Sequence, residues 1–301
     1  VTGTIDDDAA EDSALTLTTG TGTVDLQGDA GATTALGAFT LASASQADLM
    51  DVRASSLAVT ADNIDLNDTT YTATTDGVTF TGAVDLDAGA VTTTLDSSAG
   101  NGAIAFTSTI DDADSDTVLS LDAGTGTITA GGALGSTSGL GTLTVTQSGG
   151  TTFEAAVNAA TVTLTDTTGT VAFKGNTTIT TGLTTAIENY ALSFTGASNS
   201  VAGDTTLQNS GALTLGDEDT DSTTFIGGLD TAAASGTTVA GTVATSDEAM
   251  DLGAVTLAAD GTLRSGAGEI TVASIDGSTT HGLTLQDNTT ASTGEVTFTG
   301  N

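Results

Sequence analysis

The chain has 301 residues, of which 38% are hydrophobic, and it carries 38 acidic against 3 basic side chains, for a net charge of −35. The hydrophobic content is too high for an acidic disordered tail, and the negative charge excludes nucleic acid and anionic membrane surfaces as natural partners. Cysteine and proline are absent, so there are no disulfides and every strand can donate its backbone N–H groups. No apolar run approaches the roughly 18 residues needed to cross a bilayer, so no membrane insertion is expected.

Short segments in which apolar and polar residues alternate follow one another along the chain. The first covers residues 15–26 (LTLTTGTGTVDL), and later ones begin at Val78 (VTFTGAVDL) and Val162 (VTLTDTTGTVAF). Alternation points successive side chains to opposite faces of a strand. Threonine, more than a fifth of the chain, favours strands through its branched Cβ. The residues predicted to face the core include Leu15, Leu17, Val24, Leu119, Leu121, Val162 and Leu164.

One sequence block occurs twice. TIDDDAAEDSALTLTTGTGTVDLQG, which begins at Thr4, returns as TIDDADSDTVLSLDAGTGTITAGG from Thr109. The two repeats cover residues 4–107 and 109–212, and a degenerate remainder follows with a looser copy from Gly266. Because a repeat brings like residues together many times, this pattern predicts a single continuous scaffold over residues 1–301.

The spacing of the segments predicts the fold class. A full cycle of strands and turns takes about 20 residues, close to one coil of a β-solenoid. Eight Phe, two Tyr and no Trp leave a core of small side chains, which suits a narrow interior. The prediction is therefore an all-β, elongated parallel β-solenoid (β-helix) of roughly 14 coils. Tandem β-sandwich domains of about 100 residues are the alternative, although they would need longer strands and a more aromatic core.

Two acidic runs contain the pattern D-x-D-x-D, from Asp112 and from Asp217. Carboxylates on alternate residues can converge on a hard cation such as Ca²⁺. The glycine and glutamate that complete an EF-hand loop are missing, so solvated loops that hold cations loosely are the alternative. We expect no required cofactor, and Ca²⁺ is the candidate ion for these runs. The candidate ligands are Asp111, Asp112, Asp114, Asp116, Asp217, Glu218, Asp219 and Asp221.

Catalysis is not expected from this sequence. His281 is the sole histidine and is predicted to lie in an exposed turn, and the three basic residues, Arg53, Lys174 and Arg264, are far apart along the chain. No acid–base or substrate-polarising group of residues is recognisable. Two solenoid functions stay open as further alternatives. One is a polysaccharide-active β-helix enzyme, and the other is an ice-binding solenoid, because Thr-x-Thr segments recur at irregular spacing.

The phrases GTGTVDLQG, GTGTITAGG, GVTFTGAVDLDAG, LGTLTVTQSGGTTFEAAV and GEVTFTGN resemble the degenerate repeats of very large bacterial surface and secreted exoproteins of the filamentous-haemagglutinin and autotransporter-adhesin type. The resemblance covers nearly the whole chain. It implies a right-handed parallel β-helix, extracellular or on the cell surface, that acts as an adhesin stalk, spacer or fibre building block. A self-assembling filament or surface-layer subunit is the alternative. Since neither end looks like a cap, we expect self-association end to end or with neighbouring repeats of a longer chain.

Overall fold

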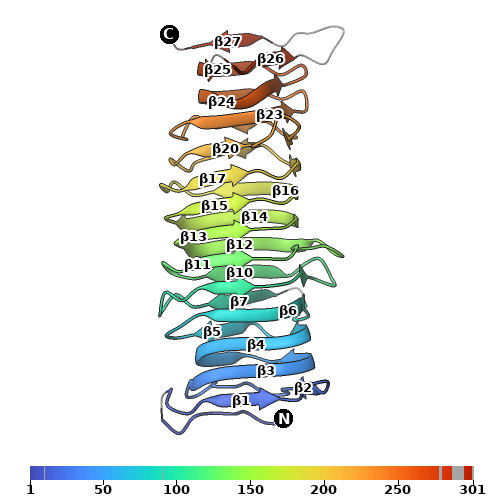
Figure 1. Cartoon of the computed structure of the whole chain (residues 1–301), viewed down its shortest axis with the longest axis vertical. Helices are drawn as coiled ribbons and strands as arrows, with labels where there is room; N and C mark the ends of the chain where they lie inside the picture. The colour runs from blue at the N-terminus through green and yellow to red at the C-terminus, as the bar shows by residue number, and fades with distance from the viewer. Residues whose placement is uncertain (10, 90, 278–279, 287–294, 300–301) are drawn as a thin grey trace. The chain divides into compact units, whose positions relative to one another are not determined.

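A computed structural model describes residues 1–9, 11–89, 91–277, 280–286 and 295–299. The described chain is all-β, and its parallel strands stack as a β-solenoid of about 13 turns (Figure 1). This confirms the predicted solenoid of roughly 14 coils. Tandem sandwiches are excluded because their strands would pair antiparallel. None of the described residues forms a helix that is long and apolar enough to cross a membrane.

The chain divides into two compact units, residues Val1–Ala159 and Ala160–Asn301, and the boundary falls within strand β14 (Val157–Thr167). The strands of the first unit are β1 (Leu15–Thr18), β2 (Thr23–Asp25), β3 (Leu36–Leu49), β4 (Val52–Leu66), β5 (Thr70–Ala73), β6 (Val78–Leu86), β7 (Thr92–Asp96), β8 (Ile104–Phe106), β9 (Ile110–Asp111), β10 (Val118–Asp122), β11 (Thr127–Ala130), β12 (Leu140–Ser148) and β13 (Gly150–Phe153). The strands of the second unit are β15 (Thr170–Phe173), β16 (Thr177–Thr185), β17 (Ala191–Phe194), β18 (Ser198–Val201), β19 (Thr205–Thr206), β20 (Leu213–Leu215), β21 (Ser222–Phe225), β22 (Leu229–Asp230), β23 (Thr237–Thr245), β24 (Met250–Arg264), β25 (Ile270–Gly277), β26 (Leu283–Gln286) and β27 (Val296–Phe298).

In the first unit each turn contributes one segment to each of three faces, and on every face the segments of successive turns pair in parallel. On each face the inward-pointing residue of one turn lies in register with that of the next, so these residues form a column. We name the three faces by these columns. Face A is the column Leu17, Leu41, Val59, Phe80, Phe106, Ala130 and Phe153. Face B is the column Val24, Ala47, Ile64, Val84, Ile110, Leu134 and Val157. Face C is the column Ile5, Ala30, Val52, Tyr71, Leu95, Leu121 and Val145.

These columns form the core. Every member is buried except Leu17 and Ile5, which are half-buried. Aromatic side chains stack where they meet on face A, with the rings of Phe80 and Phe106 5.6 Å apart. The chain buries its apolar side chains in continuous columns because each turn repeats the inward–outward alternation of the one before it.

The second unit is built on the same principle. Phe173 and Phe194 stack with their ring centroids 4.9 Å apart and their planes nearly parallel. Its core also contains a polar ladder. The buried Asn199 accepts a hydrogen bond from the backbone N–H of Thr177 and donates to the hydroxyl of Thr223. The interior therefore admits a polar residue where its neighbours on the adjacent turns supply the partners.

The predicted inward residues lie where the alternation places them. Val24, Leu119, Leu121, Val162 and Leu164 are buried. The two earliest, Leu15 and Leu17, are only half-buried, because β1 pairs with β3 alone among the described strands. Part of the looser third copy, residues 278–279 and 287–294, lies outside the described residues.

The two copies of the repeated block occupy different faces. Leu17 lies on face A, whereas its counterpart Leu121 lies on face C. From Leu17 the chain returns to face A four times, ending at Phe106, and then crosses face B at Ile110 before it reaches Leu121. One repeat therefore spans four turns and two thirds. The second copy therefore starts one face away from the first. The repeated sequence specifies which side chains point inward and where the chain bends between faces, but it does not specify which face a strand occupies.

We expect Leu121→Asp to unfold the turns around face C. An unpaired charge in a dry interior costs several kcal/mol. Ser120→Asp adds the same charge to an outward-facing neighbour in the same strand and should leave stability nearly unchanged. Thermal unfolding followed by circular dichroism measures both. Equal melting temperatures for Leu121→Asp and the wild type would mean that the inward assignment is wrong.

Candidate functional site

The first predicted acidic run folds into a loop that closes on one of its own carboxylates. Asp112 is fully buried, and its side chain accepts hydrogen bonds from the backbone N–H of Asp114 at 3.2 Å and of Thr117 at 2.8 Å. The hydroxyl of Thr117 donates to the same carboxylate at 3.1 Å. Asp112 therefore serves as the hydrogen-bond acceptor that holds the loop together.

The first copy of the repeat uses its equivalent residue in the same way. The side chain of Asp7 accepts the backbone N–H groups of Asp8, Asp12 and Ser13 at 2.8, 3.0 and 2.8 Å. These hydrogen bonds, the one from Ser13 above all, hold the pKa of Asp7 well below its usual range. The acidic run of the repeat is thus a loop-building element that occurs twice.

The residue before each buried aspartate reaches the next turn. Asp6 accepts the N–H of Thr33 at 2.8 Å, and Asp111 accepts that of Thr137 at the same distance. The loop of the next turn, to which Asp6 or Asp111 is bonded, contains a glycine in both copies. A Cβ on this glycine, Gly31 or Gly135, would collide with a backbone carbonyl oxygen. The positive φ of both glycines is a second reason for their identity. Asp111 therefore has a defined structural partner in the adjacent turn.

The second predicted run has the same organisation. Asp221 is buried, and its carboxylate accepts the backbone N–H groups of Asp217 at 2.9 Å and Glu218 at 3.0 Å. Burial and the proximity of Asp221 raise the pKa of Asp217. The remaining candidates of the two runs, Asp114, Asp116, Asp217, Glu218 and Asp219, are exposed.

Within the described residues, three acidic ligand atoms lie within 4.8 Å of one another in two places, Asp7–Asp8–Asp12 and Asp29–Asp51–Asp68. Neither group contains one of the eight predicted ligands. Calcium at Asp111–Asp116 and at Asp217–Asp221 therefore stays a prediction. The first group is already engaged through Asp7, whereas the second lies on the outer surface of face C.

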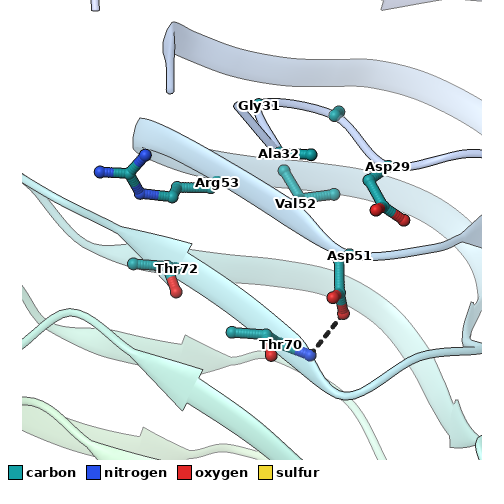
Figure 2. A pocket seen from close by; sticks show the side chains of 9 residues that line it. Asp29, Gly31, Ala32, Asp51, Val52, Arg53, Thr70 and Thr72 are labelled. Carbon is teal, nitrogen blue, oxygen red and sulfur yellow. Dashed lines mark hydrogen bonds between the residues drawn. The ribbon is translucent and has the colours of Figure 1, made fainter. Parts of the chain in front are cut away.

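Two members of the second group, Asp29 and Asp51, line a hollow of about 280 Å³ to which three successive turns contribute (Figure 2). Asp29 precedes the bridge at Ala30, Asp51 precedes β4, and Asp68 precedes β5, so all three lie at the same corner. Figure 2 shows the carboxylates of Asp29 and Asp51 on the same side of the hollow, with Arg53 extending away from them.

Asp51 is hydrogen-bonded to the backbone of the next turn. Its carboxylate accepts the N–H groups of Thr69 at 3.0 Å and Thr70 at 2.7 Å. Burial, together with the charges of Asp68 and Asp29, nevertheless raises the pKa of Asp51. Three half-buried carboxylates at one corner offer oxygen ligands of the type that Ca²⁺ takes.

Sequence reasoning did not single out this group. Its members come from three successive turns and none lies in an acidic run, so only the lengths of the individual turns bring them together. His281, predicted to be an exposed turn residue, is half-buried between β25 and β26. No protein-family model, curated protein or solved structure matches the chain.

Replacing Asp112 with alanine should destabilise the protein by about 1–3 kcal/mol, because it leaves the two buried donors of Thr117 without their acceptor. Asp116→Ala removes an exposed carboxylate from the same loop and should change stability by less than about 0.5 kcal/mol. Urea unfolding of the two variants measures the difference. Equal losses would contradict the structural role of Asp112.

Proposed function

We propose that this chain is a structural β-solenoid segment of an extracellular or cell-surface protein. It acts as an adhesin stalk, a spacer or a fibre building block, and it has no catalysis of its own. The observation that carries the proposal is the unbroken register of the inward columns. Seven turns of face A stack residue on residue from Leu17 to Phe153. Because each turn contacts only its neighbours, such a fold gains length by adding turns without redesigning a core.

The use of the acidic residues supports the same proposal. Asp7, Asp112 and Asp221 are acceptors for the backbone of their own loops. Asp6 and Asp111 hold the loop of the next turn. Three of the eight predicted calcium ligands, Asp111, Asp112 and Asp221, thus take part in the scaffold. The resemblance to filamentous-haemagglutinin and autotransporter-adhesin repeats agrees with a mechanical role outside the cell.

A filament or surface-layer subunit is the second candidate. Val296 and Phe298 lie on β27, which pairs with β25 alone among the described strands, and they are 41% and 55% exposed. Exposed apolar side chains on such a strand can be covered by further turns of the same chain or by another copy.

Deleting residues 59–79 tests the modular scaffold. The deletion joins Ala58 to Phe80, which occupies the place of Val59 one turn later, so the remaining turns keep their register. We expect a folded protein that still unfolds cooperatively. Deleting residues 59–80 is the matched control, because it puts Thr81 in the inward position and should destabilise the chain strongly. Unfolding of the first variant would contradict a scaffold built of interchangeable turns.

Sedimentation in Ca²⁺ and in Na⁺ at equal ionic strength separates the two structural roles. A stalk or spacer stays monomeric in both salts. A subunit that polymerises should form larger species, preferentially in Ca²⁺, because divalent ions bind and screen the acidic surface that otherwise keeps copies apart. A strictly monomeric species at high protein concentration in both salts would eliminate the filament candidate.

A further inference from the structure

An uninterrupted column of aspartates runs along the outside of face B in the first unit. Asp25 pairs with Asp48, Asp48 with Asp65, Asp65 with Asp85, and Asp85 with Asp111. Each of these pairs joins adjacent parallel strands, whose spacing is about 4.8 Å. Five carboxylates therefore follow one another at the separation of neighbouring strands.

The centre of the column is held together by amide side chains. Nε2 of Gln46 lies 2.9 Å from Oδ1 of Asp48 and 2.5 Å from Oδ2 of Asp65, so one amide group brings the two carboxylates to the same place. Nδ2 of Asn63 donates to the other oxygen of Asp65 at 2.8 Å. These donors orient the carboxylates, but they carry no charge that would compensate two anions.

The groups that face Asp65 from the neighbouring turns are acidic. They are Asp48 at the end of β3, Asp85 on β6 and Asp87 just after β6, with Asp25 and Asp111 two turns away. On its own strand, Asp62 is exposed and Asn63 is neutral. Asp48, Asp65 and Asp85 are all half-buried, so water screens them only in part.

We propose that Asp65, which Gln46 holds against Asp48, carries a proton at mildly acidic pH, and that this proton makes the stability of the first unit respond to acidification. One proton between the two carboxylates replaces a repulsion by a hydrogen bond, in the manner of paired carboxyl groups. This inference goes beyond the structural role proposed above and does not depend on it.

The titration of Asp65 has a definite sign. Burial, the charge of Asp87 and the contact with Asp48 raise its pKa to about 6, from 3.8 in the unfolded chain. The folded protein therefore keeps a proton that the unfolded chain has already released. The stabilisation is fully present below the unfolded value and is lost as the pH rises through about 6. At pH 5 folding takes up roughly 0.8 of a proton at this residue.

The test compares Asp65→Asn with Asp62→Asn by urea unfolding between pH 5 and pH 7. Both variants remove one negative charge from the same strand, but only the first removes the paired carboxyl group. We expect the wild type and Asp62→Asn to lose stability from pH 5 to pH 7, and Asp65→Asn to lose less, with a difference in slope that averages about half a proton over this range. At pH 7 Asp65→Asn should be more stable than the wild type. Equal pH slopes for Asp65→Asn and Asp62→Asn would overturn the proposal.

A second measurement needs no variant and so does not depend on whether Asp65→Asn folds. The carboxyl ¹³C resonance of Asp65, assigned through its strand neighbours in the wild-type protein, should titrate with a midpoint near pH 6. A midpoint near pH 4 would overturn the proposal.

Discussion

The parallel register of successive turns is the constraint on which the rest of this structure depends. In this fold a residue is followed, one strand spacing away, by the residue at the same position of the next turn. On the inside this rule is favourable, because Phe80 over Phe106 and Leu95 over Leu121 exclude water continuously. On the outside it puts Asp48 over Asp65 and Asp65 over Asp85. The same geometry that builds the core therefore concentrates like charges.

The sequence was sufficient to predict the alternation and the fold class, because both are local. Leu119 and Leu121 are buried as their spacing predicts, since a period of two needs only a few residues to be recognised. The number of residues in each turn, by contrast, cannot be read from a short stretch of sequence. Along face A the step from Leu41 to Val59 is much shorter than the step from Phe80 to Phe106, although each is one full turn. The unequal turn lengths were therefore not predictable, although the total of about 13 turns matches the predicted roughly 14 coils.

The acidic residues show why the site was harder to predict than the fold. D-x-D-x-D is the beginning of a calcium loop, but it is equally a loop whose aspartate accepts backbone N–H groups, as Asp112 and Asp221 do. Sequence spacing cannot distinguish a calcium loop from a loop closed by its own aspartate, since both need a short carboxylate side chain near a turn. The aspartates of the column from Asp25 to Asp111 are unevenly spaced along the chain. Their alignment can therefore be recognised only when the length of each turn is known from the structure.

Two sets of carboxylates in this chain differ in their surroundings. Asp7, Asp112 and Asp221 receive two or more backbone N–H groups each, so they are the acceptors that hold the folded loops together. Asp48 and Asp65 receive amide protons from Gln46 and Asn63 but face further carboxylates. For Asp7 folding favours the charge and lowers the pKa, whereas for Asp65 it opposes the charge and raises the pKa. Protonation therefore acts in opposite directions on these two residues, and mild acid, which leaves Asp7 ionised, relieves the repulsion at Asp65.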